Sequence, residues 1–187
     1  MRKGLAVVVV TMCFGTMVAG AAQQGTAAKK LLVKNTATRK ILYKAKNDTG
    51  TVVGDPTVGG ATFNLQLTTG GTGGGTQCFS LPSTGWSAIS TLGFKYRDPQ
   101  LVNGPVKVAQ IKATPSGVFT IKVIAKGDGI TVTPGDPSTT SYATNFSVSA
   151  GDEYCGSSGS ATPNPNDAQT FNVVNDDGTT CTLPLCP

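Results

Sequence analysis

GFKYRDPQLVNGPVKVAQIKATPSGVFTIKVIAKGDG, residues 93–129, is the stretch that decides the fold. In 118–125, Phe119, Ile121, Val123 and Ala125 share one face while Thr120 and Lys122 share the other, which is the period of a half-buried strand. The preceding segment 114–117 (TPSG) places Pro and Gly where a type I turn prefers them. The stretch therefore predicts an antiparallel hairpin of 106–113 with 118–125, and a change of apolar phase in the first strand predicts a bulge around Ala109 and Gln110.

Turn signals recur along the rest of the chain about every 8 to 12 residues, and alternating apolar segments lie between them. We therefore expect an all-β fold, an antiparallel β-sandwich that forms a single domain over 30–187. The glycine-rich stretch 68–75 is expected to be a hairpin tip, because the strand-like QCFSL follows it where a phosphate loop needs a helix. The further strands are expected at 30–34, 40–46, 61–67, 77–81, 142–150 and 171–174, with short segments at 86–90 and 130–132.

The N-terminus has the features of an export signal. Arg2 and Lys3 precede an apolar run at 5–18, and small residues lead to a polar pair at 23–24. We expect a signal peptide over 1–22 with cleavage after Ala21 or Ala22, followed by a flexible lead at 23–29. Cleavage would remove two basic residues and lower the formal net charge from +5 to +3. The apolar run is too short to span a bilayer comfortably, so the mature chain is expected to be secreted, periplasmic or at the cell surface, without a membrane span.

Four cysteines follow the signal, and an even number in an exported chain predicts two disulfides. They are Cys78, Cys155, Cys181 and Cys186. Three pairings remain open on the sequence alone. We prefer Cys155 with Cys186 and Cys78 with Cys181, and a local loop between Cys181 and Cys186 is the main rival.

Metal and cofactor sites are not expected. The chain has no histidine and no C-x-x-C pair, which argues against zinc. The segments 164–167 and 175–178 offer oxygen ligands for calcium, but neither matches the twelve-residue calcium loop.

Catalytic chemistry is also hard to find in this sequence. Without histidine, a Ser-His-Asp or Cys-His mechanism is impossible. Asp98, Asp152 and Glu153 lie near predicted strand ends, where turn and capping roles are the ordinary expectation. We therefore expect a protein that is not an enzyme.

The lysines are spread along the chain, and several alternate with apolar residues in predicted strands. This pattern indicates solvated outer faces of sheets, and it does not favour nucleic acid as a partner. Envelope or extracellular polymers and self-association remain the candidate partners.

Several motifs, in this order, resemble a family of exported bacterial β-domain proteins whose function has not been characterised. The resemblance covers most of 30–187 and implies an extracytoplasmic β domain in which Cys155 pairs with Cys186. Cys78 and Cys181 depart from the family pattern, and this supports pairing them with each other. The motifs are RKILYKAKND (39–48), DPTVGGATFNLQL (55–67), FSLPSTGW (79–86), FKYRD (94–98), NGPVKVAQIK (103–112), IKVIAKGDGI (121–130), EYC (153–155) and the closing CP (186–187).

These observations lead us to expect an exported, non-enzymatic module with a structural, adhesive or binding role in the envelope or extracellular space. The alternative is a carbohydrate-binding or carbohydrate-active protein. In that case Trp86, Tyr96 and Tyr154 would be the stacking surfaces, with Asp98 or Glu153 as polar contacts.

Overall fold

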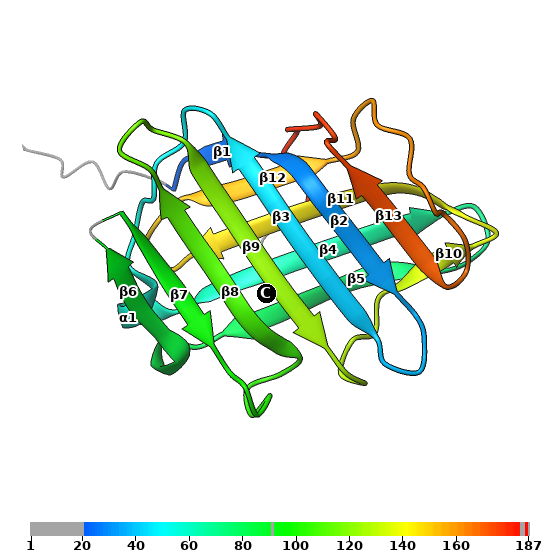
Figure 1. Ribbon diagram of the computed structural model, residues 1–187, viewed down its shortest axis with the longest axis horizontal. Coiled ribbons are helices and arrows are strands. Elements are labelled where there is room, and N and C mark those ends of the chain that lie inside the picture. Colours follow the sequence, from blue (N-terminus) through cyan, green and yellow to red (C-terminus); the bar gives the residue numbers. More distant parts are fainter. Residues whose placement is uncertain (1–20, 91, 184–185, 187) are drawn as a thin grey trace, which may run out of the picture.

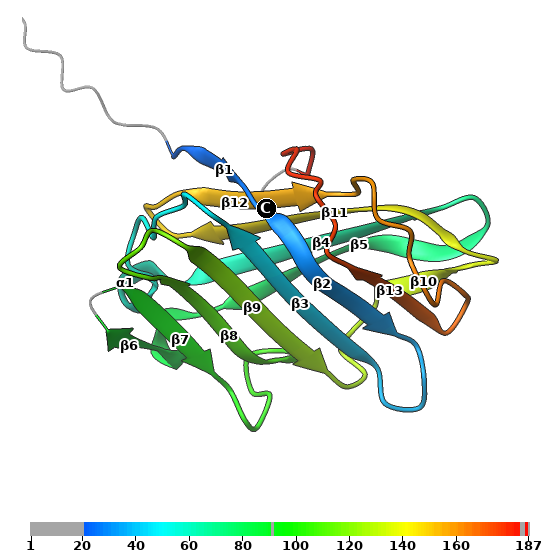
Figure 2. The ribbon, with the colours of Figure 1, turned by 45° about the horizontal axis from the view of Figure 1, so that its top comes forward.

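The computed structural model describes residues 21–90, 92–183 and 186, and it confirms an all-β sandwich. Two mostly antiparallel sheets pack against each other with their strands crossing, as Figures 1 and 2 show from two directions. The predicted signal segment 1–22 lies outside the described residues, apart from Ala21 and Ala22.

The sheet at the front of Figure 1 has seven strands, in the order β13-β2-β3-β9-β8-β7-β6, and all its neighbours are antiparallel. The predicted hairpin, β8 with β9, is confirmed, and the N–H of Gly117 donates to the carbonyl of Thr114 in its turn. The strands are β2 (Ala27–Lys34), β3 (Lys40–Asn47), β6 (Trp86–Ser90), β7 (Gly93–Arg97), β8 (Val106–Ala113), β9 (Phe119–Lys126) and β13 (Thr170–Val174).

The second sheet has six strands in the order β1-β12-β11-β4-β5-β10. Only β1 pairs in parallel, with β12. The strands are β1 (Gln23–Gly25), β4 (Ala61–Thr69), β5 (Thr72–Leu81), β10 (Thr133–Asp136), β11 (Thr139–Val148) and β12 (Glu153–Ser157). Two short helices, α1 (Pro56–Gly59) and η1 (Ser83–Gly85), lie in the connections that flank β4 and β5.

The core lies between the sheets and is built by inward-facing alternate residues of both. Tyr43 of β3 stacks on Phe63 of β4 with ring centroids 5.2 Å apart, and Phe119 of β9 stacks on Tyr154 of β12 at 4.5 Å. The buried hydroxyl of Tyr43 accepts a hydrogen bond of 3.0 Å from Thr144 of β11, so a polar contact also joins the sheets. A buried hydroxyl with such a partner avoids the cost of an unsatisfied polar group.

Three local expectations were wrong. The bulge of β8 lies between Val106 and Val108, because Val108 faces outward opposite Ile124 instead of into the core. The lead at 23–29 is strand, formed by β1 and the start of β2. Residues 130–132 are not strand, because the side chain of Gln77 bonds this segment in place of a neighbouring strand. The side-chain oxygen of Gln77 accepts from the N–H groups of 131 and 132, and its amide nitrogen donates to the carbonyl of Gly129.

Two disulfides are present, but the preferred pairing was wrong. Cys155 pairs with Cys181, and Cys78 pairs with Cys186. Cys155 and Cys78 belong to one cross-strand row on the outer face of the six-stranded sheet, with Asn145 of β11 and Asn64 of β4 between them. The bridges therefore fix Cys181 over β12 and Cys186 over β5. We call the tail from Cys181 to Cys186 the strap.

Strand spacing explains this pairing. Cys155 and Cys78 are three strand spacings apart, about 14 Å, which five residues of extended chain can cover at about 17 Å. The tail reaches the sheet beside β12, where the N–H of Ser157 donates to the carbonyl of Gly178. Cys181 is therefore the cysteine that arrives next to Cys155, and Cys186 comes late enough in the chain to reach β5. Leu183 is buried on the way, and its carbonyl accepts from the amide of Asn145 at 3.2 Å.

Peptide mapping of the oxidised protein without reduction should recover Cys78–Cys186 and Cys155–Cys181 fragments. Replacing Cys78 and Cys186 by Ser should lower the free energy of unfolding more than replacing the other pair, because their loop spans 108 residues rather than 26. The chain-entropy model gives about 5 and about 3.5 kcal/mol for the two bridges. Denaturant unfolding measures both values, and a Cys155–Cys186 peptide would contradict the pairing.

Candidate functional site

The three residues predicted as stacking surfaces do not form a surface. Trp86, Tyr96 and Tyr154 are all buried in the core. The indole N–H of Trp86 donates to the carbonyl of Leu81 at 3.0 Å, and its ring packs on Tyr96. The hydroxyl of Tyr154 donates to the carbonyl of Thr51. No ring face of these residues is open to a sugar, so the stacking prediction was wrong.

The candidate carboxylates have structural partners. Asp98 accepts from the N–H groups of Val102 and Asn103 at 3.1 and 2.7 Å, and the Asn103 bond is the largest of the causes that lower the pKa of Asp98. Asp152 and Glu153 accept from the side chains of Gln24 and Gln23, at 2.6 and 3.1 Å. These two acids therefore hold β1 against β12.

The two oxygen-rich segments considered for calcium also bind the protein's own donors. The buried carboxylate of Asp176 accepts from Tyr142 Oη at 3.0 Å and from the N–H groups of Gly159 and Ala161. Asp167 accepts from the N–H groups of Gln169 and Thr170, at 2.9 and 2.8 Å. Within the described residues, no cluster of three or more Cys, Asp or Glu side chains could hold a metal ion.

A cationic outer face on the seven-stranded sheet was not predicted from the sequence. Every described Lys and Arg except Arg39 lies in a strand of the seven-stranded sheet. The alternate residues of these strands are buried, so the basic side chains point to the outer surface. We call this surface the lysine face. Its members are Lys29, Lys30, Lys34, Lys40, Lys44, Lys46, Lys95, Arg97, Lys107, Lys112, Lys122 and Lys126.

Strand register orders the lysine face into rows that run across the strands. Lys30 is paired with Lys44, and Lys44 with Lys122; we call these three the first lysine row. Gln110 and Lys95 extend this row over β8 and β7. Neighbours within the row are separated by one strand spacing, about 4.8 Å.

A second lysine row lies further along the same strands. It consists of Lys34, Lys40 and Lys126, again paired directly across β2, β3 and β9. The two rows are four positions apart along each strand, which is about 13 Å. Between them lies the apolar row, made of the half-buried Leu32, Leu42, Ile124 and Val108.

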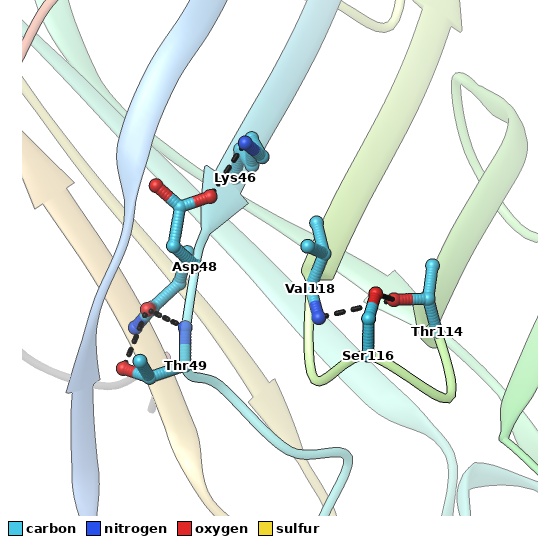
Figure 3. A network of polar contacts seen from close by, with 7 residues as sticks. Lys46, Asp48, Thr49, Thr114, Ser116 and Val118 are labelled. Atoms are coloured by element: carbon cyan, nitrogen blue, oxygen red, sulfur yellow. Dashed lines mark hydrogen bonds and ion pairs between the residues drawn. The ribbon is translucent and has the colours of Figure 1, made fainter.

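Little negative charge offsets this face. None of the seven described strands of the sheet contains Asp or Glu. Among the described residues, one lysine has an ion-pair partner: Lys46 lies 2.5 Å from Asp48 just beyond the end of β3 (Figure 3). The hydrogen bond and the charge of Lys46 lower the pKa of Asp48. Like charges directly opposite each other in a sheet are destabilising, so the lysine rows do not help to stabilise the fold.

The outer face of the six-stranded sheet differs. Its described strands contain no Lys or Arg, and its outward positions are mostly Ser, Thr, Asn and Gln. Both disulfides, with Cys181, Leu183 and Cys186 of the strap, also lie there. The sandwich therefore has one cationic face, whereas the described strands of the other sheet carry only the acids Asp136 and Glu153 as charges.

Comparisons with known proteins found no matching family model, no matching curated protein and no matching solved structure. Membership of the family of exported β-domain proteins therefore stays a prediction that rests on the motifs. No helix in the described ranges is long and apolar enough to cross a bilayer.

The four tyrosines should titrate abnormally. Burial is the main cause that raises the pKa of Tyr43, Tyr96 and Tyr142 and raises that of Tyr154 to about 12. The unfolded value is about 10. Because the folded values are higher, this contribution to stability is complete below about pH 10 and is lost as the pH rises toward 12 and beyond.

Ultraviolet absorbance should accordingly detect no tyrosine that ionises near pH 10 while the protein is folded. Ionisation should occur at higher pH, together with unfolding followed by circular dichroism. The guanidinium-unfolded chain is the control and should titrate near pH 10. A tyrosine that ionises reversibly near pH 10 in the native protein would mean an exposed ring, and would reopen the stacking hypothesis.

Proposed function

We propose that this protein is an exported, non-enzymatic binding module of the cell envelope or extracellular space, and that it attaches to polyanionic material through the lysine face. The observation that carries the proposal is the direct pairing of lysines across three strands, twice on one sheet. Selection for stability alone would not favour such rows, because opposite-charge pairs in the same positions would stabilise the sheet. A sequence feature that lowers stability without a structural benefit is expected at a functional site.

Segregation of charge supports the same function. The acids of the described chain lie in turns and loops or in the six-stranded sheet, and none lies within β2, β3 or β9. Asp48, just after the end of β3, is paired with Lys46 at the edge of the lysine face. A protein with modest net charge can therefore present one strongly positive side. Such a field orients the molecule toward an anionic partner and raises the association rate.

The chain lacks histidine and its candidate carboxylates have structural roles, and this favours binding over catalysis. The chain has no histidine, and Asp98, Asp152 and Glu153 are held by hydrogen bonds with structural roles. The carbohydrate-active alternative also lacks its stacking surface, because Trp86 and Tyr96 are in the core.

Export is supported by the disulfides and by the contacts of Ala22. Two disulfides are typical of an oxidising compartment outside the cytoplasm. The N–H of Ala22 donates to Asp152 at 3.1 Å, and the carbonyl of Ala22 accepts from the N–H of Glu153 at 3.0 Å. Cleavage after Ala21 would preserve both contacts and would turn the first into an ion pair between the new ammonium group and a carboxylate. Cleavage after Ala22 would remove both.

We therefore expect the mature protein to begin at Ala22. Intact mass and N-terminal sequencing of protein recovered from the periplasm or medium of an expressing bacterium measure this directly. Asp152→Asn should weaken the attachment of β1, and this should appear as faster amide hydrogen exchange in 22–25. The control is Asp136→Asn, which is far from the N-terminus in sequence and lies on another strand, and it should leave that exchange unchanged. A mature chain that begins at Gln23, or full-length protein in the cytoplasm, would contradict this model.

The binding proposal is tested with poly-L-glutamate, a polyanion without sugar. The native protein should bind it, with affinity falling as salt concentration rises, because neutralised charges release counterions. The variant Lys30→Gln/Lys44→Gln/Lys122→Gln should bind roughly 100-fold more weakly, from about 1 kcal/mol for each lysine near an anionic surface. Its thermal stability at low salt should be equal or higher, since repulsion within the row is removed.

The matched control is Thr62→Glu/Gln66→Glu/Ser80→Glu. It changes the net charge by the same amount but on the outer face of the six-stranded sheet, where these positions lie on β4 and β5. Its affinity should stay within about threefold of native, because the altered charges lie more than a Debye length, about 8 to 10 Å, from the lysine face. Equal weakening of the two variants would show that only net charge matters and would overturn the proposed site.

A further inference from the structure

We infer that the partner of the lysine face is a linear acidic polysaccharide, with a carboxylate or sulfate on its sugar units, lying across the strands along the lysine rows. This inference rests on the proposed function and names the chemistry of the polyanion. It follows from the spacing of the charges, from the apolar row between them, and from the side chains that the face lacks.

The charge spacing fits a polymer with about one charge for each sugar. Lys30, Lys44 and Lys122 are one strand apart, about 4.8 Å, which is close to the length of one pyranose unit in an extended chain. Gln110 continues the row with a neutral amide that can bond sugar hydroxyls, and Lys95 adds a further charge. A chain lying along this row meets three adjacent ammonium groups, then an amide, then a fourth ammonium group.

The apolar row supplies the second contact. Leu32, Leu42 and Ile124 are half-buried. Leu42 and Ile124 line one hollow together with lysines of both rows, whose aliphatic stems add to the apolar surface. A surface that alternates charge with flat apolar groups matches a sugar ring, which has charged or hydroxyl edges and C–H faces. The same row is half-buried and contains no Trp or Phe, the bulky anchors that typically insert into a lipid interface.

The missing side chains argue against nucleic acid. The aromatic residues in the strands of this sheet, such as Tyr43, Phe119 and Phe171, belong to the buried core, and Phe94 of β7 is partly buried against that core. The lysine face therefore offers no platform on which bases could stack. Arginine is the usual choice for bidentate phosphate contacts, yet only Arg97, on β7, is present on the face. Lysine ammonium groups act as hydrated point charges, which suits repeated weak contacts with carboxylates or sulfates.

The test compares five probes at equal charge concentration and equal salt: polygalacturonate, poly-L-glutamate, double-stranded DNA, single-stranded DNA and phosphatidylglycerol vesicles. Neutral dextran serves as the uncharged reference. We expect polygalacturonate to bind roughly tenfold or more tightly than poly-L-glutamate, because burial of the apolar row adds to the charge contacts. Isothermal titration calorimetry or fluorescence anisotropy of labelled polymers measures the affinities.

Two variants of the apolar row separate this inference from the function on which it rests. Leu42→Gln and Ile124→Thr keep the charges, and each should reduce the affinity for polygalacturonate about three- to tenfold while leaving poly-L-glutamate binding unchanged. Thermal unfolding confirms that each variant is folded, and Ile124→Thr retains a strand-forming residue if Leu42→Gln is too disruptive.

Tighter binding of DNA or of vesicles, or equal affinity for polygalacturonate and poly-L-glutamate, would overturn the polysaccharide inference and leave the polyanion-binding function intact. Loss of binding to every anionic probe would overturn both. Binding to neutral dextran as tight as to polygalacturonate would show recognition of sugar without charge and would also overturn the inference.

Discussion

The packing of β3 against the six-stranded sheet is the constraint on which the rest of the structure depends. Tyr43 stacks on Phe63, and its hydroxyl bonds Thr144, so one side chain joins three strands of two sheets. Once Tyr43 faces inward, strand periodicity sends Lys40, Leu42 and Lys44 outward. The lysine face is thus the outer side of the same alternation that builds the core, and a slip of one residue would bury the charges.

Much of this fold could be predicted from local pattern. The alternation in 118–125 and the TPSG turn identified the central hairpin, and the same reasoning located most of the longer strands. The short strands were missed because Glu153–Ser157 contains Gly and Cys and lacks a clear apolar alternation, while Gln23–Gly25 looks like a polar lead. Glu153–Ser157 becomes a strand by antiparallel pairing with β11, the preceding strand. Gln23–Gly25 becomes a strand by pairing with Glu153–Ser157, over a separation of about 130 residues that no local signal reveals.

The candidate site was less predictable, because it depends on which strands are neighbours and in what register. Each strand of the lysine face shows the alternation of Lys with apolar residues, but the sequence does not state that β3 pairs with β9. That pairing places Lys44 opposite Lys122 and makes a row out of separate positions. The disulfides illustrate the same limit, since the order Cys155, Asn145, Asn64, Cys78 across the sheet decides which cysteine the tail reaches first.

The arrangement of the cysteines also bears on what happens to an incomplete polypeptide. Cys78 and Cys155 sit three strand spacings apart, about 14 Å, whereas the Cα atoms of a disulfide lie within about 7 Å. A chain interrupted before Cys181 therefore cannot close a wrong bridge within the folded sandwich, and it presents two free thiols on one side. Complete chains can therefore oxidise all four cysteines into two disulfides, whereas incomplete chains keep two free thiols. Those free thiols can still react with folding catalysts that exchange thiols and disulfides.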